Sequence, residues 1–150
     1  MSATTLEAVL QNIGHAAELL VCCLQNELKA LNDKQYESLI NIAQEKQQLV
    51  DRLDMLDNQR KQHDNSVNFS DYLMQQDRSG KLARQWDSIR GTIKECQQQN
   101  IVNGQLLQRY RRLSQETINL LSGRPVNTDT TYGPNGLKQG QGSLISDTRV

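Results

Sequence analysis

The sequence predicts an all-α protein: an antiparallel hairpin of two long helices and a longer third helix form a three-helix, coiled-coil-like bundle, followed by a flexible C-terminal tail. Three observations predict this fold. Only 36% of the 150 residues are apolar and 4% are aromatic, which suits extended helices that each bury one stripe. Apolar residues, mostly leucine, recur at spacings of three and four. Five of the nine glycines and both prolines fall at or after Gly123, where no apolar period survives.

The first helix is expected over about residues 5–31. Thr4 is suited to cap it, with Glu7 as the partner of a capping box. Asn32 and Asp33 then favour a turn and are able to cap the next helix. The apolar residues that recur along the helix are Leu6, Leu10, Ile13, Ala17, Leu20, Leu24, Leu28 and Leu31.

The second helix is expected over about residues 34–61. Because it is about as long as the first and follows a tight turn, the two helices should pair antiparallel. Lys46 stands at a position of the apolar stripe, where its stem can lie along apolar neighbours while the ammonium stays outside. The stripe consists of Tyr36, Leu39, Ala43, Lys46, Val50, Leu53 and Leu56.

Residues 62–80 break the helical pattern. Ser70 is suited to cap a short helix over about residues 70–77, and Gly80 ends it or lets the chain turn. This segment therefore connects the hairpin to the third helix.

The third helix is expected over about residues 81–121. Gly123 and Pro125 stop it, because glycine suits the position after a helix and proline cannot continue one. We therefore expect a helical bundle over residues 1–123 and a flexible tail over 124–150. The stripe of this helix consists of Leu82, Trp86, Ile89, Ile93, Cys96, Asn100, Asn103 or Gly104, Leu107, Tyr110, Ser114, Ile118 and Leu121.

The three helices differ in length. At a rise of ~1.5 Å per residue, the first two should each span about 40 Å and the third about 60 Å. The third helix stays amphipathic to its end, so part of its apolar face should lack an intramolecular partner. Either a dedicated protein partner, a second copy of the chain or the linker folding back would cover it. The candidate partner-binding residues are Leu106, Leu107, Tyr110, Leu113, Ile118, Leu120 and Leu121.

Composition argues against several classes of partner. Seventeen basic and seventeen acidic residues balance, so the chain has no electrostatic reason to bind nucleic acid or an anionic membrane. No stretch approaches the ~20 apolar residues of a membrane span, and the N-terminus does not read as a signal peptide. Cys22, Cys23 and Cys96 form a poor disulfide framework and fit small helix residues in a reducing cytoplasm.

The sequence offers no recognisable catalytic or metal site, so neither an enzyme nor a cofactor is expected. Its two histidines, His15 and His63, lie on different elements, and no cluster has metal-ligand spacing. An exposed His15 would suit a phosphotransfer helix, but Glu18 and Leu19 one turn later would repel and crowd a phosphate. The stretch "RYRR", residues 109–112, is expected to be a solvated face or the rim of a protein interface.

Three stretches together resemble the FlgN family of flagellar export chaperones over about residues 34–136. The first is "INIAQEKQQLVDRLDMLDNQRK", which contains Glu45 and Lys46. The second is "QNIVNGQLL", with Asn100, Asn103 and Gly104 before a leucine pair. The third is "TTYGPNGLKQG", with Tyr132, Gly133 and Gly136. The asparagines and Gly104 would either let the helices approach closely or make the helix flexible as a partner binds.

The resemblance implies a small cytosolic helical protein without enzymatic activity. It implies binding of the C-terminal helical segments of hook-associated proteins, protection of these proteins from early assembly, and delivery to the export apparatus. It places cargo on the C-terminal part of the long helix, and it ties Tyr132, Gly133 and Gly136 of the tail to docking at the membrane export gate. The alternative is a structural coiled-coil protein that self-associates without cargo, but such a protein would not need the tail signature.

Overall fold

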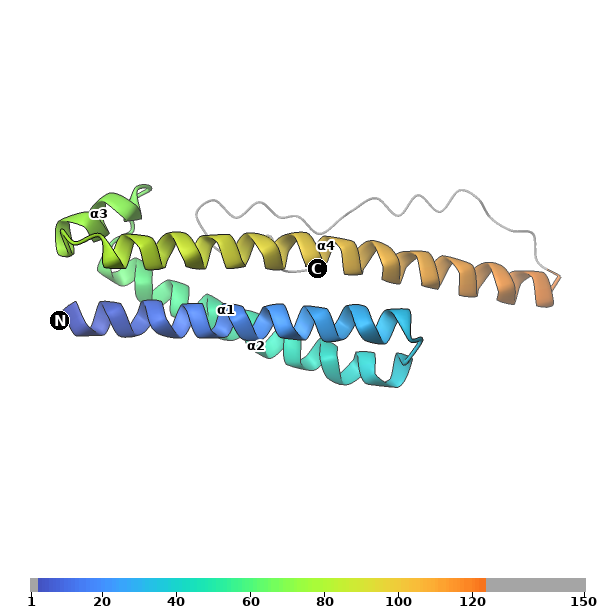
Figure 1. Ribbon diagram of the computed structural model, residues 1–150. Helices are drawn as coiled ribbons and strands as arrows, with labels where there is room; N and C mark the ends of the chain where they lie inside the picture. The colour runs from blue at the N-terminus through green and yellow to red at the C-terminus, as the bar shows by residue number, and fades with distance from the viewer. Residues whose placement is uncertain (1–2, 124–150) are drawn as a thin grey trace.

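The computed structural model of the protein describes residues 3–123, which form four helices and no strand. The helices are α1 (Ala3–Asn32), α2 (Tyr36–His63), α3 (Phe69–Gln76) and α4 (Lys81–Leu121). The prediction of an all-α helical bundle is therefore confirmed (Figure 1). The expected tail, with Tyr132, Gly133 and Gly136, lies outside the described residues.

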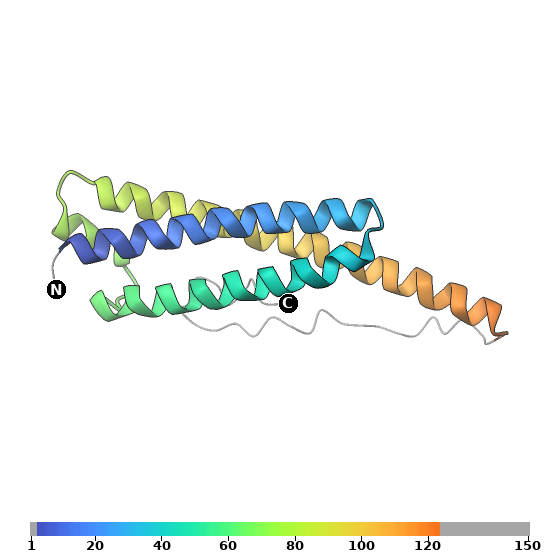
Figure 2. The ribbon, with the colours of Figure 1, turned by 90° about the horizontal axis from the view of Figure 1, so that it is seen from below.

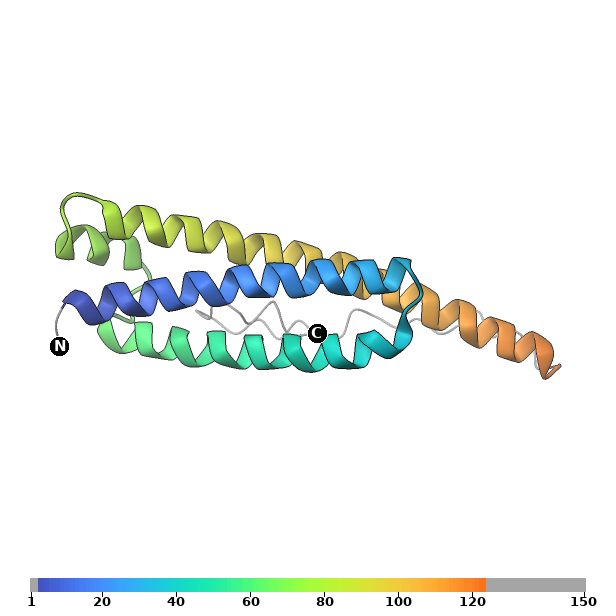
Figure 3. The same ribbon diagram turned by 60° about the horizontal axis from the view of Figure 1, so that its bottom comes forward.

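Helix α1 lies between α2 and α4 and packs against both (Figure 3). It runs antiparallel to α2 and parallel to α4. Two hydrogen bonds fix the register of the parallel pair: Cys96 Sγ donates to the Ala17 carbonyl at 3.6 Å, and Asn103 Nδ2 donates to the Leu24 carbonyl at 2.9 Å. Both pairs are separated by 79 residues, so the same offset places Leu31 beside Tyr110.

Helix α4 is longer than its neighbours, as the sequence predicts. It has 41 residues, whereas α1 has 30 and α2 has 28. With the register above, α1 ends beside residue 111, and the last turns of α4 continue past the α1–α2 turn (Figures 1 and 2). We call residues 106–121 the distal segment; its last ten residues have no part of α1 alongside them.

The turn between α1 and α2 differs from the expected one. Gln35 N–H donates to the Ala30 carbonyl at 2.9 Å and Lys34 N–H to the Leu31 carbonyl at 3.3 Å, with Lys34 in the left-handed region at φ 55°. This pattern is a Schellman motif that ends α1. Asp33 is thus part of the motif that ends α1. The expectation that Asn32 or Asp33 caps the second helix is wrong, because Gln35 is the residue that precedes α2.

The short helix begins one residue before the expected start. Asn68, rather than Ser70, precedes it, and the Asn68 carbonyl accepts from the Asp71 and Tyr72 amides at 3.2 and 3.4 Å. The start is set by Phe69, which is buried in the core at the first helical position. Gly80 turns the chain into α4 in the left-handed conformation, at φ 78°.

The core is one continuous apolar cluster that contains α1, the second half of α2, α3 and the first part of α4. The predicted stripe of α4 is buried from Leu82 to Asn103. In α2 the expected stripe is wrong in its first half, because Tyr36 and Ala43 are exposed. Lys46 interrupts the apolar row there, and no residue of α2 before Leu49 is fully buried.

Two of the three cysteines pack in the core as small apolar residues, as expected. All three are free; Cys22 is exposed, whereas Cys23 and Cys96 are buried. Burial raises the pKa of the Cys23 thiol to about 11, with a further contribution from the nearby Glu45 carboxylate, and burial raises the pKa of Cys96 to about 12. Both buried thiols therefore stay protonated at neutral pH.

Candidate partner-binding site

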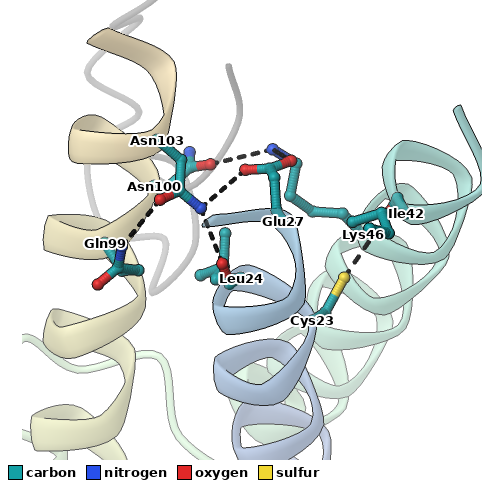
Figure 4. A network of polar contacts seen from close by, with 8 residues as sticks. All are labelled: Cys23, Leu24, Glu27, Ile42, Lys46, Gln99, Asn100 and Asn103. Atoms are coloured by element: carbon teal, nitrogen blue, oxygen red, sulfur yellow. Dashed lines mark hydrogen bonds and ion pairs between the residues drawn. The ribbon is translucent and has the colours of Figure 1, made fainter. Parts of the chain in front are cut away.

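Three residues of the quoted helical stretches converge with Glu27 in a polar network that joins α1, α2 and α4 (Figure 4). Lys46 Nζ donates to Glu27 Oε2 at 2.9 Å and to Asn100 Oδ1 at 3.2 Å. Asn103 Nδ2 donates to Glu27 Oε1 at 3.0 Å, in addition to its bond to the Leu24 carbonyl. Gln99 Nε2 completes the set by donating to Asn103 Oδ1 at 2.8 Å.

The network lies where the apolar core of the bundle ends. Glu27, Asn100 and Asn103 are only 9%, 2% and 1% exposed, and among the described residues no buried side-chain nitrogen or oxygen lacks a hydrogen-bond partner. A slip of either neighbouring helix would leave these groups unpaired, at a cost of roughly 1–3 kcal/mol for each. The network therefore specifies the register that places the end of α1 beside Tyr110.

Only part of this network was predicted from the sequence. The sequence pattern pointed to Lys46, Asn100 and Asn103 but not to Glu27, although a carboxylate three residues after Leu24 lies close to the apolar stripe of the first helix. Glu45 is exposed and lies outside the network. A Cβ at Gly104 would meet no atom within 4 Å, so Gly104 does not mark a close approach between helices.

Replacing Glu27 with alanine should lower the free energy of unfolding by roughly 1–3 kcal/mol, because the buried Asn103 amide and the partly buried Lys46 ammonium would each lose an acceptor. Urea unfolding followed by circular dichroism measures this loss. Glu18→Ala, an exposed change on the same helix, is the matched control and should stay within about 0.5 kcal/mol of the parent. Equal losses in the two variants would contradict a stabilising role for the network.

A second cluster fixes the opposite end of the bundle and was not predicted from the sequence. The Arg60 guanidinium lies 4.7 Å from the Phe69 ring centroid and 4.9 Å from that of Trp86. Arg60 Nε donates to Asp57 Oδ1 at 2.7 Å, and the Phe69 and Trp86 rings meet edge to face at 4.9 Å. These contacts join the end of α2 to α3 and to the first turns of α4.

The candidate partner-binding residues lie on α4 beyond the polar network. Leu106, Leu107 and Tyr110 are half-buried beside the end of the hairpin. Further along, exposure rises: Leu113 is 47% exposed, Ile118 57%, Leu120 71% and Leu121 85%. Among the described residues, no part of α1 lies beside this apolar face after residue 111, so the face is able to accept an amphipathic segment of another chain.

Other sites are not found in the described part of the chain. His15 is exposed, and no three His, Cys, Asp or Glu side chains within residues 3–123 are grouped to hold a metal ion. No helix in the same range has the length and hydropathy needed to cross a membrane.

The comparisons with known proteins agree with the sequence resemblance. The family model described as FlgN protein matches residues 1–140, a range that includes the bundle and the Tyr132, Gly133 and Gly136 signature. Comparisons with curated proteins and with solved structures gave no match. Because the family model matches far more than half of the sequence, the chain belongs to the FlgN family of flagellar export chaperones.

Proposed function

We propose that this protein binds the C-terminal helical segments of hook-associated proteins on its distal segment, keeps them from assembling early and delivers them to the export gate. FlgN family chaperones bind flagellar hook-associated proteins; the cargo segment and the distal segment as its site are the proposal. The observation that carries it is the rise in exposure of apolar side chains from Leu113 to Leu121, past the end of α1.

The physical reason for such a chaperone lies in its cargo. An amphipathic segment that later polymerises is an aggregation hazard while it is unpaired. A helix with a matching apolar face covers it and is displaced later. This work requires no catalytic group and no cofactor, in keeping with a chaperone family that is not an enzyme family, and we propose that it takes place in the cytoplasm before export.

The alternative is a self-associating coiled-coil protein, because the same exposed leucines could pair with a second copy. Affinity capture of the full chain from its native cell, followed by mass spectrometry, separates the two functions. We expect hook-associated proteins among the captured partners, and calorimetry with their isolated C-terminal segments should then show direct binding. Recovery of the chain alone, together with dimers in light scattering, would favour the alternative.

The tail signature carries a separate prediction. Tyr132 combines a large apolar face with a hydroxyl, the profile of an interface anchor, and Gly133 and Gly136 allow the backbone to turn around it. We expect Tyr132→Ala to leave cargo binding intact but to weaken docking to the cytosolic domain of the export-gate membrane protein and to slow export. Calorimetry with cargo bound measures the gate affinity.

The control for this prediction is Tyr36→Ala, which removes a tyrosine that is 52% exposed on α2. It should leave both affinities unchanged. Normal gate affinity in the Tyr132→Ala variant would defeat the docking role of the tail signature.

A further inference from the structure

The distal segment carries a charge that the chain as a whole lacks. The complete sequence has seventeen basic and seventeen acidic residues, but residues 106–121 contain three arginines and one glutamate, a net charge of 3 − 1 = +2. All three arginines, Arg109, Arg111 and Arg112, are exposed. None of them has an ion-pair partner within 4.0 Å among residues 3–123.

Three arginines elsewhere in the bundle have partners, whereas the exposed Arg52 and Arg78 have no ion-pair partner within 4.0 Å among residues 3–123. Arg60 pairs with Asp57 at 2.7 Å, Arg90 lies 4.0 Å from Asp87, and Arg84 Nη1 donates to the Ser79 carbonyl at 3.3 Å. The lack of an ion pair within the described residues is therefore not what distinguishes the distal arginines. Their position beside the apolar face distinguishes them.

Two of the distal arginines border the apolar face. At 3.6 residues per turn, successive side chains are rotated by about 100°, and the apolar side chains of the segment then span an arc of about 160° from Leu120 to Ile118. On the same count Arg109 lies about 20° beyond the Leu120 border and Arg111 about 20° beyond the Ile118 border. An arginine therefore flanks each side of the apolar stripe, as charged residues flank the apolar seam of a coiled coil.

We propose that the distal segment selects an amphipathic helix whose apolar stripe is flanked by acidic residues on both sides. The inference rests on the proposed function, since it specifies the cargo helix that the same face accepts. The guanidinium group forms paired hydrogen bonds with a carboxylate, so Glu or Asp beside the partner's stripe would meet Arg109 and Arg111 at the rim. Rim charges of this kind mainly raise the association rate and reject partners of the wrong charge, while the leucines supply the affinity.

The test uses the full chain and two synthetic helical peptides with the same leucine heptads, flanked by Glu in one peptide and by Lys in the other. We expect the Glu-flanked peptide to bind about fivefold to tenfold more tightly at low salt. The difference should shrink as ionic strength rises, because ~0.1 M salt screens exposed charges over about 10 Å. The double variant Arg109→Glu/Arg111→Glu should reverse the preference.

A matched control reverses two exposed arginines away from the distal segment, as Arg52→Glu/Arg78→Glu. It makes the same change in net charge and should keep the preference of the parent. The inference would be overturned if the parent bound both peptides with equal affinity or bound neither. It would also be overturned if the control variant lost the preference for the Glu-flanked peptide as fully as the Arg109→Glu/Arg111→Glu variant does. If a hook-associated segment binds the parent and the Arg109→Glu/Arg111→Glu variant alike, the proposed function stands and the charge selection fails. If no hook-associated segment binds at all, the proposed function fails.

Discussion

Replacing Trp86 with alanine is expected to lower the free energy of unfolding by about 3–5 kcal/mol, the usual cost of deleting a large aromatic side chain from a core. Trp86 is 5% exposed and contacts both the Phe69 ring and the Arg60 guanidinium. Its loss would remove the surface on which α2, α3 and α4 meet. Since domains of this size are stable by about 5–15 kcal/mol, the variant should be only marginally folded.

Urea and thermal unfolding followed by circular dichroism measure this effect, and we expect the melting temperature to fall by roughly 10–20 °C. Trp86→Phe keeps a ring in the cluster and should cost less. Met55→Ala, at a residue that is 54% exposed on α2, should stay within about 0.5 kcal/mol of the parent. A loss below ~1 kcal/mol for Trp86→Ala would mean that the aromatic cluster does not hold α3 in place.

The long helices were predictable because their apolar residues recur at spacings of three and four over many turns, even where a polar residue such as Lys46 interrupts the row. The stripe of α4 is buried at its predicted positions from Leu82 to Asn103, including two asparagines that a composition argument alone would have placed outside. The ends of the helices were less predictable, because the backbone conformation of the turns and the packing of single residues set them. Lys34 adopts a left-handed conformation that is uncommon for lysine and could not be predicted from the residue type. Phe69 begins α3 because its side chain packs in the core.

The polar network was predictable in part. Sequence spacing identified Lys46, Asn100 and Asn103, but only the fold shows that they meet one another and Glu27. The difference in length between the helices, together with the amphipathic pattern that continues to the end of α4, predicted an apolar face that the hairpin does not cover. The cluster around Arg60 was missed because its members come from three elements and share no spacing in the sequence.

Replacing Leu113 with glutamate is expected to abolish cargo binding, with a loss of affinity of about 100-fold or more, while the helix content stays nearly unchanged. Leu113 lies midway along the length of the proposed cargo face and is 47% exposed in the free protein. The free protein therefore accommodates the change, and glutamate is a good helix former. In the complex, burying the carboxylate against the apolar stripe of the cargo costs several kcal/mol. An i, i+4 ion pair with Arg109 would offset only about 0.5 kcal/mol of this cost.

Calorimetry with a hook-associated segment measures the affinity, and circular dichroism of the same sample measures the helix content. Met55→Glu introduces the same charge at a similarly exposed apolar residue on α2 and should bind cargo normally. Arg109→Ala and Arg112→Ala should weaken binding much less than Leu113→Glu, as rim charges do. If Leu113→Glu unfolds the protein, Leu113 is a core residue and the length argument is wrong. If the variant folds and still binds cargo, the distal segment is not the cargo face, because a carboxylate inside a buried apolar contact would weaken binding strongly.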